Sequence, residues 1–400
     1  MNTKQNVDAS YTLAILLKST GTNTRWSTRE AMKIQRLTLE NFRNYETGDI
    51  ALEDGVNVFI GENAQGKTNA LEAIYFLAMG KSHRTAKDSE CIRSTASRAS
   101  VRGEITVKEH PHTLQIDITP NGKRASVNGV SQSKMTDFLG HFQVVLFAPE
   151  DLQLVKGSPG VRRRFIDMEL GQTHPKYLYH LAQYNRVLQQ RNTLLKQATV
   201  DWDYIGVFDE QLAEHGAEVT LRRHRFIEEM KKYASDIHEH IAHGRETLCI
   251  AYQPSIRTES DFTLETVTSL TSQYLRLLQT KRQQDFQTRH TTVGPHRDDM
   301  AFFIDDQSVQ SFASQGQQRT VALAIRLAEI EFIHQEVGDY PVLLLDDVLS
   351  ELDDQRQTNL IISMHDRVQT VITTTSLAPF HGMLEGQMRL FHVHSGIITG

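Results

Sequence analysis

Cysteine, long apolar runs and net positive charge are scarce or missing in this chain of 400 residues. Its two cysteines, Cys91 and Cys249, are too few for a disulfide framework, so we expect a reducing, cytoplasmic setting. No apolar run approaches the roughly 20 residues of a membrane helix, so we expect no membrane partner. The formal net charge is −6, so any contact with nucleic acid would depend on a local basic patch.

Two residue patterns, a histidine metal site and a set for nucleophilic catalysis, are also missing. His238, His240 and His243 lie close together, but position 242 is alanine, so the H-E-x-x-H spacing fails. No Ser-His-Asp or Cys-His combination stands out. The hydrophobic content of 39% and charged content of 23% are those of a globular protein large enough for two or three domains.

The strongest positive signal is a glycine-rich loop that follows the apolar run 56–60 and precedes the helix-compatible stretch 69–79. A strand, this loop and a helix form the context in which G-x-x-x-x-G-K-[ST] binds phosphate. We expect Lys67 to reach the β- and γ-phosphates of ATP and Thr68 to ligate Mg²⁺. The candidate ATP-binding residues are Gly61, Glu62, Asn63, Ala64, Gln65, Gly66, Lys67 and Thr68.

Two carboxylates end a second apolar run, residues 341–347. A continuous apolar run is typical of a parallel strand that is covered on both faces. Asp346, at its end, is placed to hold Mg²⁺, and Asp347 is the candidate base or water-positioning group. Alone, such a pair is often a solvated strand exit, but a phosphate loop in the same chain favours a catalytic site.

A third candidate element precedes a strong helix predicted over residues 320–335. Ser314, Gly316 and Gln317 form a small turn whose N–H groups and hydroxyl could bind phosphate. One ATP does not need two such sites from one subunit, so the turn predicts two subunits facing each other head to tail. The alternative is that Ser314 is an ordinary helix N-cap.

The order of these motifs resembles the ABC-type ATPase heads of SMC-like proteins, and further strings are similar to the RecF family over about residues 32–400. They include residues 40–45 (ENFRNY), 81–85 (KSHRT), 147–152 (FAPEDL), 294–299 (GPHRDD) and 373–375 (TTT). The resemblance implies that Asp353 belongs to a D-loop. Thr375 lies where transporter ATPases carry a switch histidine, and Gln143 is an open candidate for a glutamine loop.

The same resemblance implies an ATP-gated homodimer that binds gapped or junction DNA without sequence preference. It also implies cooperation with RecR and RecO in loading RecA, and weak, regulatory ATP hydrolysis stimulated by DNA. A clamp with another chromosome-maintenance role is the main alternative. A phosphotransferase would not need the Ser314 turn, and a transport ATPase would carry that turn far closer to the loop.

The predicted fold is an α/β ABC-type ATPase head with a mixed sheet, an inserted helical lobe and no long coiled coil. The 279 residues between Lys67 and Asp346 are too many for a transporter-type ATPase without an insertion and too few for an SMC rod. We expect a leader over 1–31, disordered or arising from a mis-assigned start, and ATPase halves over 32–155 and 287–400. The helical insertion would span residues 156–286.

A local basic patch lies within that insertion. Residues 156–196 contain eight Lys or Arg against two acids, an excess that suits a phosphate backbone. The candidate DNA contacts are Arg162, Arg163 and Arg164. The alternative is that they form structural ion pairs within the fold.

Overall fold

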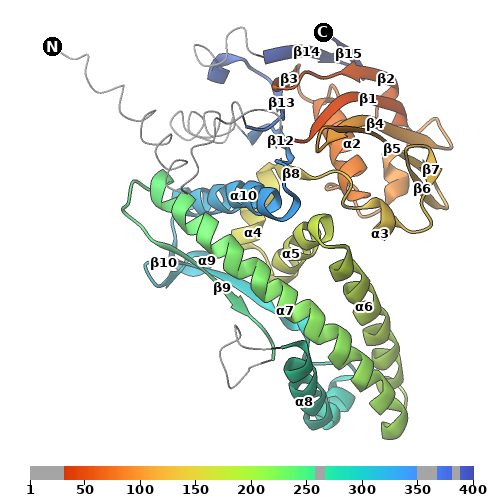
Figure 1. Cartoon of the computed structure of the whole chain (residues 1–400), viewed down its shortest axis with the longest axis vertical. Coiled ribbons are helices and arrows are strands. Elements are labelled where there is room, and N and C mark those ends of the chain that lie inside the picture. Colours follow the sequence, from red (N-terminus) through yellow and green to blue (C-terminus); the bar gives the residue numbers. More distant parts are fainter. Residues whose placement is uncertain (1–30, 257–265, 349–366, 381–387) are drawn as a thin grey trace.

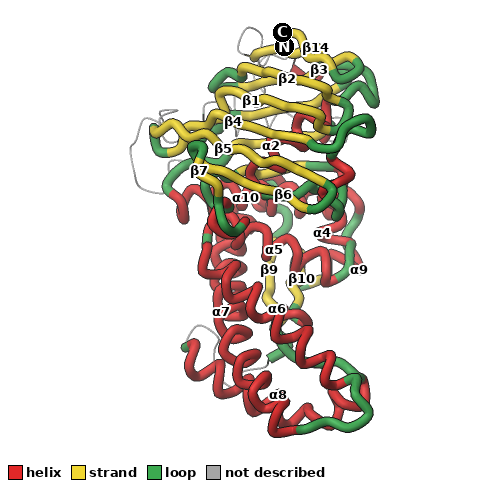
Figure 2. Tube along the Cα trace, turned by 90° about the vertical axis from the view of Figure 1, so that its right-hand side faces the viewer, coloured by secondary structure: helices red, strands yellow, loops and turns green. Residues whose placement is uncertain are grey.

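The computed structural model describes residues 31–256, 266–348, 367–380 and 388–400. An elongated molecule results, with two six-stranded sheets at one end and a helical lobe at the other (Figures 1 and 2). The strands are β1 (Lys33–Phe42), β2 (Tyr45–Ala51), β3 (Val56–Ile60), β4 (Ala99–Val107), β5 (His110–Thr119), β6 (Gly122–Val127), β7 (Val130–Ser131), β8 (Val144–Phe147), β9 (Leu248–Gln253), β10 (Asp299–Ile304), β11 (Gln307–Ser308), β12 (Val342–Asp346), β13 (Thr370–Thr374), β14 (Met388–His394) and β15 (Ile397–Thr399).

The helices vary from single turns to one of 40 residues. They are α2 (Lys67–Met79), α3 (Met135–Phe138), α4 (Leu152–Lys156), α5 (Pro159–Thr173), α6 (Pro175–Leu195), α7 (Trp202–Ile241), α8 (Val267–Thr288), α9 (Val309–Phe312) and α10 (Gln315–Val337). None of the described helices is both long and apolar enough to cross a bilayer.

The sheet that carries the site has the order β15-β14-β3-β13-β12-β8, and its five strands from β14 to β8 run parallel. Every residue of β12 is buried, as its continuous apolar sequence predicts. Leu343 and Leu345 belong to the apolar core that includes residues of α5, α7 and α10, while Val342 and Leu344 belong to the core around α2. The sheet is therefore covered on both faces, which fixes the positions of its strand ends.

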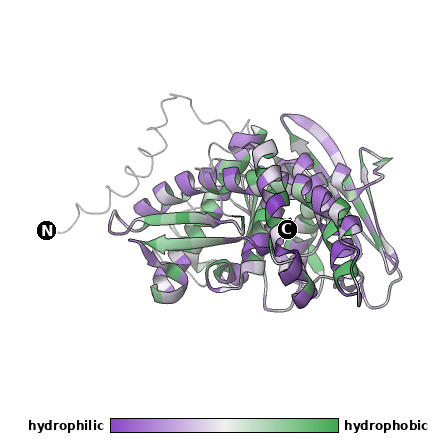
Figure 3. Ribbon diagram, turned by 90° about the horizontal axis from the view of Figure 1, so that it is seen from below, coloured by the Kyte–Doolittle hydropathy of each residue, from purple (hydrophilic) through white to green (hydrophobic). Residues whose placement is uncertain are grey.

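The second six-stranded sheet is antiparallel, with the order β2-β1-β4-β5-β6-β7. Asn128 and Gly129 both have positive φ, at 50° and 79°, and form the hairpin turn between β6 and β7. Helix α2 lies between the two sheets in a shared apolar core. Hydrophobic residues concentrate where helices meet strands, and hydrophilic residues cover the outward-facing turns (Figure 3).

Three helices, α6, α7 and α8, build the helical lobe around a third apolar cluster. The mixed α/β head is thus confirmed, and the described residues contain no long coiled coil. One predicted boundary is wrong: α10 begins at Gln315, five residues before the expected start, so Gly316 and Gln317 lie inside its first turn. The expectation for a leader falls on residues 1–30, outside the described residues. Ala31 pairs with Tyr340 in an isolated bridge.

Candidate nucleotide-binding site

The glycine-rich loop connects β3 to α2, and two of its glycines are required by close backbone approaches. Gly66 has φ 120°, and a Cβ on it would lie 2.6 Å from Asn44 Nδ2. A Cβ on Gly61 would lie 2.3 Å from the carbonyl oxygen of Val393. A side chain at either position would force the loop out of shape. Because both positions are glycine, the loop keeps a shape in which its backbone N–H groups can surround an anion.

Lys67 is the first residue of α2, and its side chain folds back over the loop. The Nζ atom donates hydrogen bonds of 2.8 Å to the carbonyl oxygens of Gly61 and Glu62. Burial lowers the pKa of Lys67, while Asp347 and Asp346 act in the opposite direction. A buried cation held by neutral carbonyls at a helix N-terminus fits a phosphate group.

Thr68 and Asp346 come together at the end of β12. The Thr68 hydroxyl donates to Asp346 Oδ1 at 2.8 Å, and the Thr373 hydroxyl donates to the same oxygen at 2.7 Å. A hydroxyl and a carboxylate are hard oxygen ligands, so this pair fits Mg²⁺.

Asp347 follows β12 in the left-handed conformation, with φ 53°. Its N–H donates to Thr373 Oγ1 at 3.0 Å, which fixes the turn. Burial raises the pKa of the Asp347 carboxyl, Lys67 opposes this, and Asp346 adds to it. The carboxyl therefore holds its proton more readily than an ordinary aspartate, a property that suits a proton acceptor.

Residues outside the glycine-rich motif hold the loop in place, and no pattern in the sequence predicts this role. Asn44 Nδ2 donates to the Gln65 carbonyl and the Tyr45 hydroxyl to the Gly66 carbonyl, each at 2.9 Å. From the opposite side, Ser395 N donates to Gln65 Oε1 at 2.7 Å. Asn44 and Tyr45 belong to a string that carries the family resemblance, but nothing in that string indicates which atoms they contact.

Ser314 caps α10 and is exposed to solvent. Its hydroxyl accepts a hydrogen bond from Gln317 N at 3.2 Å, and its own N–H donates to Gln317 Oε1 at 2.7 Å. Gln317 Nε2 also donates to Glu246 at 2.9 Å. Ser314 is therefore a genuine N-cap, and its contact with a partner's phosphate stays a prediction.

Among the described residues, Gln143 and Thr375 make no hydrogen bond to the residues of the site. The buried Gln143 side chain donates to the carbonyls of Gly140 and Gln172, so it holds the start of β8 in place. Asp353 lies outside the described residues. Thr375 is exposed immediately after β13.

The three arginines of residues 162–164 differ in burial, because they lie on different faces of α5. Arg162 is buried; its Nε and Nη2 bind the Asp299 carboxylate at 2.7 and 2.8 Å, and Nη1 donates to the Gly157 carbonyl. This corrects the prediction for Arg162, because its donors are used inside the fold. Arg163 is half-buried and donates to the Asp298 carbonyl, while Arg164 is exposed.

Comparisons with known proteins agree with this geometry. The family model described as RecF/RecN/SMC N terminal domain matches residues 33–399. A DNA replication and repair protein RecF from Oceanobacillus iheyensis is 47% identical over 372 residues, covering 92% of this chain and all of the relative. The RecF of Geobacillus kaustophilus is also 47% identical, covering 92% of this chain and 99% of its own.

Solved structures give the same result. The recombination mediator protein RecF-ATP in the RecFOR pathway matches with a TM-score of 0.84 and 34% identity, over 92% of this chain and 99% of that one. The corresponding RecF-ATPrS structure matches with a TM-score of 0.86 and 34% identity, over 94% and 99%. An Smc head bound to the C-winged helix domain of ScpA, at 17% identity and TM-score 0.52 over 92% and 96%, shares the fold.

Proposed function

Because the chain belongs to the RecF family of DNA replication and repair proteins, we propose that it is an ATP-dependent DNA-binding protein that acts as an ATP-gated homodimer. The observation that carries the proposal is the meeting of Lys67, Thr68, Asp346 and Asp347, from two distant parts of the chain, at one edge of the parallel sheet. Structures of relatives described as RecF-ATP and RecF-ATPrS support ATP as the nucleotide.

Each residue has a distinct role in this proposal. Lys67 and the loop N–H groups hold the phosphates, and Thr68 and Asp346 hold Mg²⁺. Asp347 orients the attacking water and accepts its proton. ATP with Mg²⁺ supplies the transferable phosphoryl group and the neutralising charge. Ser314, Gly316 and Gln317 of a second copy, with Asp353, complete the site across the dimer.

The dimer would act at gapped or junction DNA, without sequence preference. Relatives described as members of the RecFOR pathway support RecO and RecR as partners. The resemblance to the RecF family implies that the step assisted is RecA loading. Hydrolysis would be weak and would release the dimer from DNA.

The test combines DNA binding, light scattering and ATPase measurements on the full chain. The parent protein should form dimers and bind gapped duplex more tightly with ATP than with ADP, and Lys67→Ala should lose both effects. Lys232→Ala, at an exposed lysine of α7, is the control and should behave as the parent. Equal DNA binding with ATP and ADP, or ATP-induced dimers of Lys67→Ala, would contradict the proposal.

A further inference from the structure

A cavity of about 540 Å³ opens between α5, α6 and α7, away from the nucleotide loop. Its volume lies within the roughly 300–1,000 Å³ of typical ligand pockets. Lys81 lines one side, directly after Gly80, the C-cap of α2. Since α2 has 13 residues and rises about 1.5 Å per residue, the cavity and the loop lie at opposite ends of a helix about 20 Å long.

The cavity walls carry an excess of positive charge. Lys81, Arg163, Arg164 and Arg223 face a single carboxylate, Asp167, which leaves a net charge of +3. Asp167 is already used, because it accepts hydrogen bonds from Arg223 Nη2 at 2.7 Å and from the Tyr177 hydroxyl. Among the described residues, Lys81 and Arg164 have no carboxylate within ion-pair distance.

These cations disfavour one another. Burial lowers the pKa of Lys81, and the nearby Arg164 lowers it further. Burial and the nearby Arg223 lower the pKa of Arg163 in the same way. A bound anion would relieve both effects, since it supplies the counter-charge that the walls lack.

One further feature favours an anion. Gly160 lines the cavity in the first turn of α5, where Pro159 has no N–H and Val161 N donates to the Ser158 carbonyl, so the N–H of Gly160 is the group that this turn offers a ligand. On another wall, His296 Nδ1 lies 2.6 Å from the Tyr184 hydroxyl and its Nε2 lies 3.0 Å from the Thr291 carbonyl. His296 is thus a neutral, hydrogen-bonded wall residue, and the arginines and Lys81 provide the charge.

We propose that this cavity is a second phosphate-binding site, separate from the ATP loop, in which Lys81, Arg163 and Arg164 hold a phosphate of the DNA backbone or of a free nucleotide. If the ligand is DNA, the proposal rests on the proposed function; if the ligand is a free phosphate, it does not. Arginine and lysine at the mouth of a half-enclosed cavity suit phosphate oxygens, which accept several charge-assisted hydrogen bonds.

The first experiment measures DNA binding against salt for Lys81→Ala/Arg164→Ala. The control is Lys134→Ala/Arg245→Ala, which removes the same two residue types from exposed positions outside both the cavity lining and the basic patch 156–196. Loss of this one phosphate contact should flatten the slope of log K against log salt by about 0.9, so the affinity of the variant for DNA should be about 8-fold below that of the parent at about 0.1 M salt if the two affinities are equal at about 1 M. The control should keep the parent slope, and ATP affinity should be unchanged in both variants.

The second experiment measures the shift in melting temperature caused by inorganic pyrophosphate, at constant ionic strength, with Lys67→Ala in every protein to remove the loop site. A shift lost only in the cavity variant identifies a free phosphate as the ligand. A changed DNA slope without a pyrophosphate effect identifies the DNA backbone.

Equal behaviour of the cavity and control variants in both experiments would overturn the proposal. If the parent protein binds no DNA at all, the proposed function fails. The pyrophosphate experiment alone then decides whether the cavity is a phosphate site.

Discussion

The hydroxyl of Thr68 donates a 2.8 Å hydrogen bond to Oδ1 of Asp346, which lies 278 residues further along the chain. Thr373 donates to the same oxygen at 2.7 Å, so α2, β12 and β13 converge on one carboxylate. The two threonines make nearly the same bond, but only Thr68 adjoins the phosphate loop. This difference allows the metal-binding and positioning roles to be separated by experiment.

Thr68→Val should abolish Mg²⁺-dependent ATP hydrolysis, since it removes both a proposed Mg²⁺ ligand and a bond to Asp346. Thr373→Val removes only the positioning bonds to Asp346 and Asp347, so we expect a smaller loss of about 10- to 100-fold. ATPase rates over a Mg²⁺ titration check this. An equal loss in both variants would assign Thr68 to positioning alone.

Elements with a continuous local pattern were predictable from the sequence. The apolar run of β12 required only local information, and so did α7, in which the buried residues Ile205, Leu212, Val219 and Phe226 recur every seven positions. The polar residues 315–319 favour a turn, so the sequence alone predicts a start of α10 that is too late. Ser314 and Gln317 in fact form a capping box, which begins the helix at Gln315.

Contacts between distant residues were not predictable. The phosphate loop is a contiguous motif, whereas Ser395 meets Gln65 across 330 residues, and neither shows its partner in the sequence. Arg162 and Arg164 look alike in the sequence, but Arg162 is buried and meets Asp299 across 137 residues, whereas Arg164 is exposed. A charge run on a helix cannot reveal which members point inward until the packing of that helix is known.

Ser314→Arg should leave ATP binding by the monomer intact and block dimerisation, because Ser314 is proposed to contact the partner's nucleotide. Mixing it with Lys67→Ala should restore partial ATPase activity, since one of the two composite sites in a mixed dimer is then intact. Light scattering and ATPase assays over a range of mixing ratios measure this.

The matched control for Ser314→Arg is Thr266→Arg. Thr266 caps α8 with the same reciprocal arrangement, so its replacement should cost a similar ~1 kcal/mol of stability and leave dimerisation intact. No recovery at any mixing ratio would count against the head-to-tail arrangement. Loss of dimers in Thr266→Arg would show that cap loss alone explains the effect.

Glu169 should make stability depend on pH. Burial raises the pKa of its carboxyl to about 7, against the opposing effects of Arg326 and the Gln172 hydrogen bond. The folded state then keeps a proton that the unfolded state loses above about pH 4.3. The contribution of Glu169 to stability is therefore complete below that pH and is lost as the pH rises to 7.

Glu169→Gln should remove this pH dependence, leaving a protein that is more stable than the parent at pH 8 and similar to it at pH 4. Urea unfolding between pH 4 and 8 measures the effect. Glu210→Gln, the same change at an exposed position of α7, should keep the parent's pH dependence. Parallel curves for the parent and Glu169→Gln would refute the assignment.

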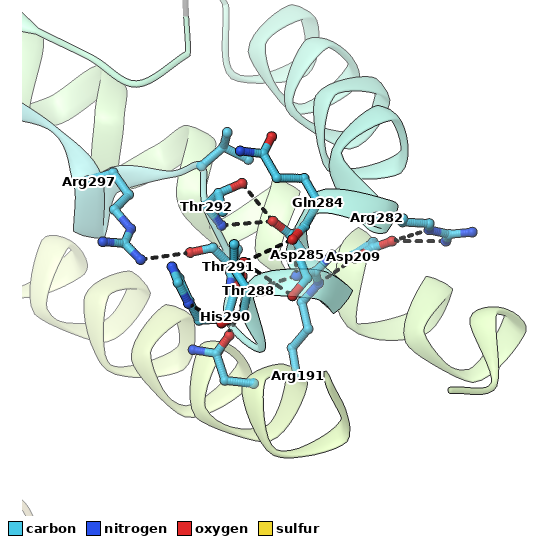
Figure 4. Close-up of polar contacts among 12 residues, drawn as sticks. Arg191, Asp209, Arg282, Gln284, Asp285, Thr288, His290, Thr291, Thr292 and Arg297 are labelled. Carbon is cyan, nitrogen blue, oxygen red and sulfur yellow. Dashed lines mark hydrogen bonds and ion pairs between the residues drawn. The ribbon is translucent and has the colours of Figure 1, made fainter. Parts of the chain in front are cut away.

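Arg191 holds the helical lobe together from inside (Figure 4). Its fully buried side chain binds Asp209 Oδ1 through Nε at 2.7 Å and Asp285 Oδ2 through Nη1 at 2.8 Å. Arg282 binds the other oxygen of Asp209, at 2.9 and 3.0 Å, but its side chain is 26% exposed. The two arginines therefore share a partner and differ in burial.

Arg191→Met should destabilise the protein by about 3–5 kcal/mol, because it leaves the buried Asp285 without its cation. Arg282→Met should cost about 1 kcal/mol or less, since that ion pair is partly solvated and Asp209 keeps Arg191. Urea unfolding of both variants, with ATP affinity as a check that the nucleotide site is intact, measures the difference. Equal losses would mean that burial does not set the strength of this network. If Arg191→Met lost ATP affinity in the absence of urea, the helical lobe and the nucleotide loop would be structurally coupled.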